Sequence, residues 1–209
     1  MDGWHKLLIV GCGRGATHYV TQVLRKCGAD FAHETAGYKD GMASWFMPPD
    51  DPSIDQLWKC GQFKPCRVME FRTVAHQVRH PLAVIRSWMS MPASRAQIEF
   101  IERHTTCSSR LSRLSFAMRY WLEWSLMCDT HSCYSYRVEQ ISKSMPQLAK
   151  KADVPFFEEA IWNTAPTNTT PNPARAVSWA DLSECDAGLT KEIKDLASLY
   201  GYNGRCLHG

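Results

Sequence analysis

The stretch that decides the fold is LLIVGCGRGATHYVTQVLRKCGADFAHE, residues Leu7–Glu34. It opens with a short apolar run that ends in glycine, which is typical of a buried parallel strand. A glycine-rich turn follows, and then apolar residues at helical spacing up to Gly28, a residue type that commonly ends helices. A second short apolar run closes the stretch. The sequence therefore predicts a strand, a turn, a helix and a second strand.

The rest of the chain continues this alternation. The predicted strands are Lys6–Val10, Phe31–Glu34, Arg67–Phe71, Thr73–Val78 and Cys133–Val138, and the predicted helices are Thr17–Cys27, Pro81–Met89, Ser109–Cys128 and Thr190–Tyr200. Two segments rich in Pro or Gly, Pro48–Pro65 and Pro155–Arg175, are predicted to be loops. Alternating strands and helices favour an α/β three-layer sandwich with a central parallel sheet.

Ligands of such sheets bind at the carboxyl ends of the strands. We therefore expect the turns after Val10, Glu34, Val78 and Val138 to converge on one site.

Length and composition restrict the function classes. The chain has 209 residues, of which 44% are hydrophobic, enough for a single domain spanning 1–209. A net charge of +3 does not by itself indicate nucleic-acid binding. No apolar run approaches the ~18 residues that cross a bilayer. Nine cysteines without a CxxC pair favour reduced thiols over a zinc site. We expect a cytoplasmic protein with no metal, nucleic-acid or membrane partner.

The glycine turn fits a dinucleotide site as a first alternative. Gly11-x-Gly13-x-x-Ala16 satisfies the G-x-G-x-x-G/A pattern of Rossmann proteins, and Glu34 lies near the place of the ribose-binding acid, ~20 residues further on. On this pattern alone, a nicotinamide-dependent oxidoreductase is the leading interpretation.

An ATP-binding Walker A loop is a second alternative, and it fits less well. If Thr17 supplies the hydroxyl, Gly15 is correctly placed. Ala16 then stands where the pattern requires lysine, and Val10 where it requires the first glycine. Without that lysine, ATP hydrolysis is disfavoured.

A third interpretation accounts for more residues. Backbone N–H groups of a turn and of a helix N-terminus bind anions. Arg14 adds a forked positive charge, and Thr17 adds a hydroxyl donor in the first helical turn. The turn therefore suits a terminal sulfate and phosphate, without magnesium.

Here the sequence resembles a known family. GCGRGATHYV, residues Gly11–Val20, is similar to the 5′-phosphosulfate loop of sulfotransferases that use 3′-phosphoadenosine 5′-phosphosulfate (PAPS). Many relatives have G-x-x-R-S-G-T-T, so this chain departs from the pattern at Gly15, Ala16 and His18. The resemblance implies a P-loop NTPase-like topology and PAPS as cofactor. The loop residues that it places at PAPS are Gly11, Cys12, Gly13, Arg14, Gly15, Ala16, Thr17 and His18.

A second element supports the same family. HQVRHPLAVIRSWM, residues His76–Met89, resembles the 3′-phosphate segment, in which a strand ends in arginine and the next helix carries a serine. Arg79 and Ser87 match these positions, and the two side chains could hold one phosphate between them. Arg175, in a late loop, is a candidate second ligand for the same phosphate.

Weaker similarities cover most of the remaining chain. HETAGYKDGMASWF, residues His33–Phe46, resembles a mostly bacterial subgroup with His-Glu, Asp-Gly and Ser-Trp. YRVEQI, residues Tyr136–Ile141, and the tail with VSWADL and LASLYGY also resemble the family.

The family chemistry implies roles for three residues. Sulfuryl transfer requires a base for the acceptor hydroxyl and stabilisation of the leaving 3′,5′-ADP. The resemblance places the base at the end of the second strand, where His33 and Glu34 stand, and we favour Glu34. Neighbours on a strand point to opposite faces, so we expect one of the two to face the sulfur. Arg14 would stabilise the leaving group.

The sequence thus predicts a PAPS-dependent sulfotransferase acting on a hydroxyl of a carbohydrate or small metabolite. Two alternatives stay open, a Rossmann oxidoreductase and a non-catalytic nucleotide-binding module. Acceptor choice is assigned to loops such as Pro48–Pro65 and Cys107–Ser109. Among the tryptophans, Trp45 suits the core and an acceptor wall equally, whereas the others considered are expected in the core: Trp88, Trp121 and Trp124.

Overall fold

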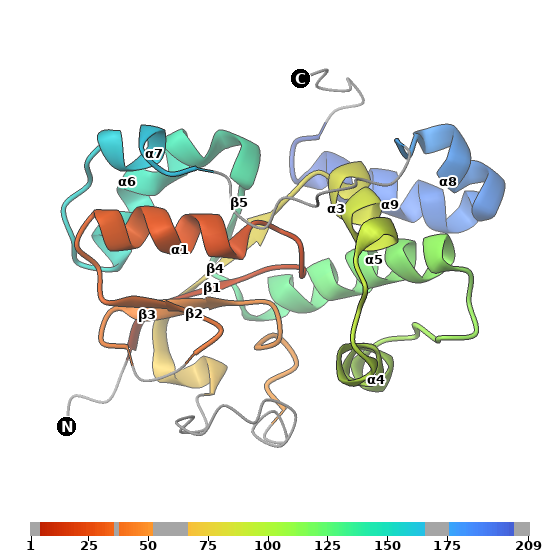
Figure 1. Cartoon of the computed structure of the whole chain (residues 1–209), viewed down its shortest axis with the longest axis horizontal. Coiled ribbons are helices and arrows are strands. Elements are labelled where there is room, and N and C mark those ends of the chain that lie inside the picture. The colour runs from red at the N-terminus through yellow and green to blue at the C-terminus, as the bar shows by residue number, and fades with distance from the viewer. Residues whose placement is uncertain (1–4, 36–37, 52–66, 166–175, 203–209) are drawn as a thin grey trace.

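A computed structural model describes residues 5–35, 38–51, 67–165 and 176–202. Its strands form a five-stranded sheet in the order β2-β3-β1-β4-β5, with every neighbouring pair parallel (Figure 1). The strands are β1 (His5–Val10), β2 (Phe31–His33), β3 (Gly41–Ser44), β4 (Phe71–Val78) and β5 (Tyr134–Arg137). The helices are α1 (Thr17–Lys26), α3 (Pro81–Ser90), α4 (Arg95–His104), α5 (Arg113–His131), α6 (Ile141–Lys151), α7 (Glu159–Trp162), α8 (Trp179–Cys185) and α9 (Ala187–Leu199), with 3-10 turns η1 (Val68–Glu70) and η2 (Val138–Gln140).

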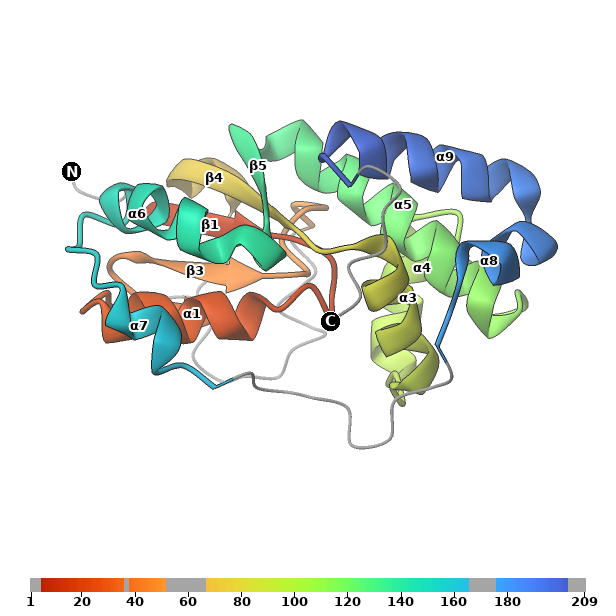
Figure 2. The same cartoon turned by 90° about the horizontal axis from the view of Figure 1, so that it is seen from above.

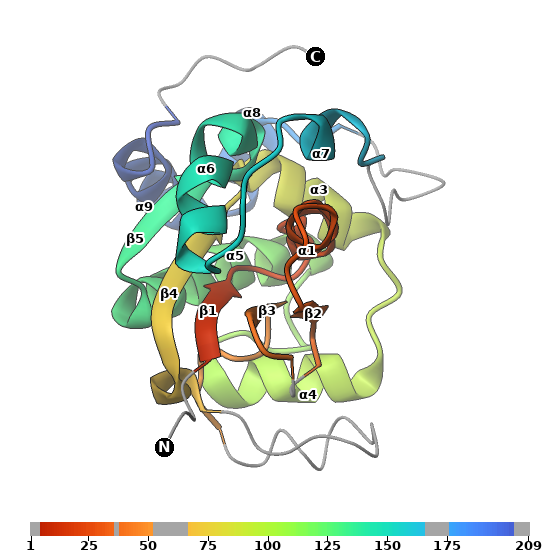
Figure 3. The ribbon, with the colours of Figure 1, turned by 90° about the vertical axis from the view of Figure 1, so that its left-hand side faces the viewer.

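The alternation of side chains along β1 builds a core on each face of the sheet. Leu7 and Ile9 pack with α1, α6 and α7, whereas Leu8 and Val10 pack with α3, α4, α5, α8 and α9. All four side chains are fully buried, as expected for the central strand of a parallel sheet. Figure 3 shows α1 and α6 on one side of the strands and α4 on the other. The predicted α/β three-layer sandwich is therefore confirmed.

The chain changes direction between β1 and β4. From β1 it runs through α1 on one face to β2 at the edge, whereas from β4 it runs through α3, α4 and α5 on the other face to β5 (Figure 2). Open α/β sheets bind ligands in the crevice that such a reversal leaves at the carboxyl ends of the strands. The glycine turn (Gly11–Ala16) and Arg79 both follow these strand ends.

Most predicted elements are confirmed with shifted ends, but several predictions are wrong or incomplete. Arg67–Phe71 is not a strand, because Val68–Glu70 forms a 3-10 turn. The long helix begins at Arg113 rather than Ser109. Ser112 caps this start, because its side chain accepts a hydrogen bond from the Ser115 backbone N–H. The helix predicted over Thr190–Tyr200 begins three residues earlier, at Ala187, and ends at Leu199.

Several elements were not predicted from the sequence, among them β3, α4, α8 and α7, which lies within the predicted Pro155–Arg175 loop. The start of α4 carries a signal in the sequence, because Ser94 and Gln97 form a reciprocal capping box. Strand β3 changes the topology most, since it lies between β1 and β2. That the whole chain is one domain stays a prediction.

Candidate active site

The glycine turn combines glycines that are needed for space with non-glycine residues in left-handed conformation. An added Cβ would lie 2.5 Å from the Gln77 carbonyl oxygen at Gly11 and 2.6 Å from the Cys12 carbonyl oxygen at Gly15. Arg14 and Ala16 have φ of 72° and 68°, a region that costs L-residues about 1–2 kcal/mol. Alternating left-handed residues turn successive backbone N–H groups into a concave anion site. Strain of this kind is concentrated at functional sites.

Helix α1 begins directly at this turn with its amino end uncapped. Ala16 is the N-cap residue, and no side chain caps the helix there. The first N–H groups of an α-helix have no partner within the helix, and the helix dipole makes this end attractive to anions. The start of α1 therefore adds further donors to the same site.

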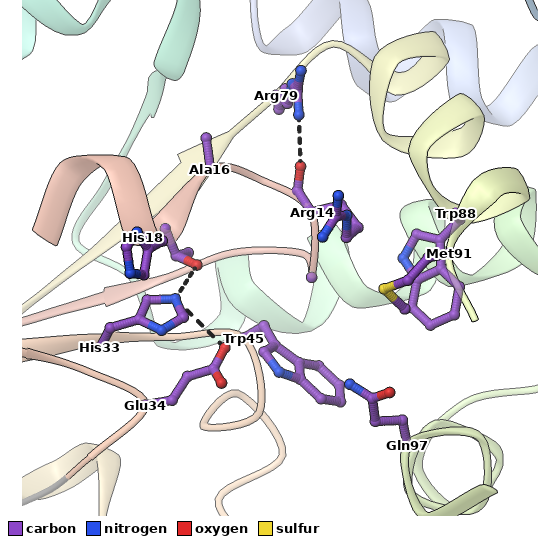
Figure 4. Close-up of a pocket in the computed structure, with 12 residues that line it drawn as sticks. Arg14, Ala16, His18, His33, Glu34, Trp45, Arg79, Trp88, Met91 and Gln97 are labelled. Atoms are coloured by element: carbon purple, nitrogen blue, oxygen red, sulfur yellow. Dashed lines mark hydrogen bonds and ion pairs between the residues drawn. The ribbon is translucent and has the colours of Figure 1, made fainter. Parts of the chain in front are cut away.

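Hydrogen bonds from neighbouring elements fix the turn. The Gly13 N–H donates to the Tyr120 hydroxyl on α5 at 2.7 Å. Arg79 Nη1, just after β4, donates to the Arg14 carbonyl at 2.9 Å (Figure 4). Tyr120 was not predicted as a site residue, because it contributes to the turn from the middle of an otherwise core-forming helix.

Two guanidinium groups lie at this site. Arg14 Nε donates to the Ser87 hydroxyl on α3 at 2.8 Å, so Ser87 contacts Arg14 directly. Burial, and then the nearby charge of Arg79, lower the pKa of Arg14. A bound anion would offset this repulsion between two positive charges. Arg14, Arg79 and Ser87 are thus brought together as the sequence predicted. Ser87 contacts Arg14 but does not line the pocket.

His33 and Glu34 both line the pocket. His33 Nε2 lies 3.0 Å from the Thr17 hydroxyl and 3.5 Å from Glu34 Oε1. Both side chains therefore line the pocket at which one of the two was expected to face the sulfur. Glu34 follows the last residue of β2 and has φ of 55°, and this left-handed conformation ends the alternation of an extended strand.

The surroundings shift the pKa values of Glu34 and His33 in opposite directions. Burial raises the pKa of Glu34 to about 7, so its carboxyl group titrates near neutral pH. Burial, and then the charges of His18 and Arg25, lower the pKa of His33 to about 4. A carboxyl group with a pKa near the working pH suits general acid–base catalysis, whereas His33 stays neutral. Glu34 is therefore the better proton acceptor of the pair.

The opposite side of the pocket is mostly apolar. Four residues line it: Trp45, directly after β3, Trp88 on α3, Met91, directly after α3, and Gln97 on α4. Trp45 and Trp88 are each 5% exposed, so both serve the core and the pocket wall. The Trp88 indole N–H is buried and has no hydrogen-bond partner among the described residues. We call these four residues the aromatic side.

The pocket has a volume of about 270 Å³ and brings most predicted site residues together. Its lining includes Gly13, Arg14, Ala16, Thr17, His18, His33, Glu34 and Arg79 (Figure 4). Gly11, Cys12, Gly15 and Ser87 do not line it. Cys12 is buried, with its Sγ 3.5 Å from the Ser125 hydroxyl. Arg175 lies outside the described residues.

Two expectations about the surroundings are not met. The turn after β5 does not line this pocket; its Gln140 lines a separate hollow with Arg137 and Tyr200. Cys107–Ser109 does not line it either, and Cys107 is buried in the core. The Pro48–Pro65 loop lies mostly outside the described residues.

Within the described part of the chain, no group of three or more His, Cys, Asp or Glu residues could hold a metal ion. None of the described helices is long and apolar enough to cross a membrane.

Comparisons with known proteins give one structural likeness. No family model and no curated protein matches this sequence. Among solved structures, a match is the crystal structure of mouse sulfotransferase SULT7A1 complexed with PAP, with 11% identity and a TM-score of 0.41. The match covers 86% of this chain and 66% of the mouse chain, just under two thirds of its length. At this identity and TM-score, the likeness carries no argument about function.

Proposed function

We propose that this protein is a PAPS-dependent sulfotransferase that transfers a sulfuryl group to the hydroxyl of a carbohydrate or small metabolite. One observation carries the proposal. A carboxyl group with a pKa of about 7 shares a pocket with two guanidinium groups and the uncapped start of α1. This combination suits the transfer of an anionic group to a neutral nucleophile that must lose a proton.

PAPS would supply the sulfuryl group, and 3′,5′-ADP would leave. In that transfer, the bond from sulfur to the acceptor oxygen would form as the bond from sulfur to the bridging phosphate oxygen breaks, and Glu34 would take the acceptor proton. Arg14 and the first amides of α1 stabilise the charge that develops on the leaving phosphate. Arg79 would hold the 3′-phosphate. Neutral His33, close to both Thr17 and Glu34, positions the base.

The strand order disfavours the Rossmann alternative. In the Rossmann order, 3-2-1-4-5-6, the strand that ends in the ribose-binding acid lies next to β1. Here β3 separates β2 from β1, and the Glu34 N–H donates to the Ala43 carbonyl on β3 at 2.9 Å. Glu34 therefore follows a strand that is not adjacent to β1, unlike the ribose-binding acid of a dinucleotide site.

We also propose a cytoplasmic location. The described part of the chain contains six free cysteines, of which four are buried: Cys12, Cys27, Cys107 and Cys128. Free thiols of this number suit a reducing compartment.

The first test is calorimetric titration with 3′,5′-ADP, beside NADH and Mg-ATP. We expect 3′,5′-ADP alone to bind, and Arg79→Ala to weaken binding by roughly 10–150-fold, the range of a hydrogen bond to a charged group. Ser87→Ala should weaken binding less, because Ser87 contacts Arg14 rather than lining the pocket. Binding of NADH instead of 3′,5′-ADP would overturn the proposal.

Arg72→Ala is the matched control. Arg72 also belongs to β4, but it lies near the amino end of the strand with its side chain 61% exposed. Its removal lowers the net charge by the same amount as Arg79→Ala. Because Arg72 is exposed and does not line the pocket, the affinity for 3′,5′-ADP should stay within about twofold of the wild-type value. An equal loss in both variants would indicate a general charge effect rather than a specific site.

A further inference from the structure

Gln77 is a buried polar residue on β4 that contacts the glycine turn. Its side chain is 1% exposed, and Nε2 donates to the Gly15 carbonyl at 2.5 Å. The Tyr136 hydroxyl, on β5, donates to Gln77 Oε1 at 2.7 Å. A hydroxyl donor on the oxygen fixes which end of the amide faces the turn, so the NH₂ group is directed at Gly15. These two hydrogen bonds connect β5 with the turn through the Gln77 side chain.

This bond has a consequence for the next amide in the chain. A trans peptide is planar, so its C=O and N–H groups point in opposite directions. The described chain has no cis peptide bonds. With the Gly15 carbonyl held toward Gln77, the Ala16 N–H points away from Gln77. Ala16 itself lines the pocket and begins α1.

Arg79 acts on the preceding carbonyl in the same way. Gln77 and Arg79 are two positions apart, the repeat of an extended strand, and they bind the consecutive carbonyl groups of Gly15 and Arg14. Carbonyl oxygens carry partial negative charge and would repel an anion. The end of β4 therefore holds two acceptors of the turn that would otherwise be free to face an anion.

We propose that Gln77 is a positioning residue of the anion site, which holds the Gly15 carbonyl toward the sheet and thereby directs the Ala16 N–H at the 5′-phosphosulfate end of the nucleotide. The proposal rests on the proposed function for the identity of the anion. Gln77 does not line the pocket, so its effect passes through the backbone of the turn.

The experiment compares two ligands in Gln77→Met, which keeps a similar side-chain length without the donor. The ligands are 3′,5′-ADP and adenosine 3′-phosphate, which lacks the 5′ anion. We expect the affinity for 3′,5′-ADP to fall by roughly fivefold to tenfold, the upper part of the range of one hydrogen bond, whereas the affinity for adenosine 3′-phosphate changes by less than about twofold. Tyr136→Phe frees the Gln77 amide to rotate. It should also lower the affinity for 3′,5′-ADP, but by a smaller factor than Gln77→Met.

A merely structural role predicts a different pattern. Both ligands would then weaken equally, and the inference would be overturned. Ile193→Val is the control for lost stability, because Ile193 is fully buried on α9 and does not line the pocket. It should leave both affinities unchanged.

The failure of the proposed function can be separated from failure of this inference. If the wild-type protein does not bind 3′,5′-ADP, the Ala16 amide resonance is followed by NMR during titration with inorganic sulfate. A shift in wild type that is lost in Gln77→Met supports the role of Gln77, whereas no shift in wild type overturns it. Equal binding of 3′,5′-ADP by wild type and Gln77→Met overturns the inference and leaves the proposed function intact.

Discussion

The two sides of the pocket are built in different ways. The charged side (Arg14, Arg79, His33 and Glu34) follows the carboxyl ends of β1, β4 and β2, and hydrogen bonds connect its residues with the turn and the start of α1. On the aromatic side (Trp45, Trp88, Met91 and Gln97), the two indole rings are held by packing against other rings, and the Gln97 side chain is held in the capping box of α4. The Trp45 ring contacts Phe100, with ring centroids 5.9 Å apart, and the Trp88 ring contacts Tyr120, with ring centroids 4.8 Å apart.

This difference separates two tasks. Anions need donors and positive charges at fixed positions, and a short turn between a strand and a helix provides these in a few residues. An organic acceptor needs a surface that is complementary in shape, and side chains from distant segments can provide it. We therefore expect changes on the charged side to affect nucleotide binding and chemistry, and changes on the aromatic side to affect the acceptor.

The largest expected effect is that of Glu34→Gln. Loss of a general base lowers turnover by about 10²–10⁴-fold, and 3′,5′-ADP affinity should stay near the wild-type value. Turnover is measured as sulfate transfer to an acceptor found by screening hydroxyl compounds, and 3′,5′-ADP affinity is measured by calorimetry. Glu192→Gln, an exposed change on α9, should leave both unchanged. Full turnover in Glu34→Gln would exclude Glu34 as the base.

Unfolding experiments can show that this loss is not caused by instability. Burial raises the pKa of Glu34 to about 7 in the folded protein, above its usual value near 4.5. Between these pH values the folded state binds more protons than the unfolded state, so ionisation of Glu34 costs stability as the pH rises toward 7. Glu34→Gln removes this cost and should be more stable than wild type above neutral pH.

The second effect is a pH dependence of turnover. Since the base must be ionised, the rate should rise with pH through about 7, by roughly tenfold between pH 6 and pH 8. His33, with its pKa lowered to about 4, does not titrate in this range. Initial rates in wild type across this range test the expectation, and a flat profile would contradict it.

The third effect tests the aromatic side. Met91→Ala removes part of a half-buried apolar wall, and we expect the acceptor KM to rise by roughly threefold to tenfold, since each lost methylene contact costs ~1 kcal/mol. The 3′,5′-ADP affinity should not change. Leu199→Ala, an exposed change on α9, is the control. If Met91→Ala weakened the nucleotide and not the acceptor, the division between the two sides would be wrong.

The smallest effect concerns Ala16→Gly on the charged side. Glycine relieves a left-handed strain of about 1–2 kcal/mol, but it adds about 0.5–1 kcal/mol of backbone entropy to the unfolded state. The net gain in unfolding free energy should be about 1 kcal/mol or less, measured by urea unfolding. Affinity for 3′,5′-ADP should stay the same or improve slightly. A clear loss of affinity would indicate that the Ala16 methyl group contacts the ligand.

The sequence was most informative where the determinants are local. The buried run of β1, the glycines of the turn and the apolar spacing of α1 lie within 28 consecutive residues, and steric limits and helical periodicity act over that distance. The same holds for Arg79, which directly follows β4, and for Ser87, two turns into the next helix. These residues were predicted together, and the structure brings them together.

The tertiary structure alone decided the rest. The insertion of β3 between β1 and β2, the left-handed turn that brings Glu34 beside His33, and the contacts of Gln77 and Tyr120 with the turn have no spacing code in the sequence. The same is true of the aromatic side, which joins residues on or directly after β3, α3 and α4. Such contacts depend on how distant segments pack, and many arrangements of the same local elements satisfy the local rules. Only burial of both faces of the sheet selects one arrangement and, with it, the surroundings that raise the pKa of Glu34.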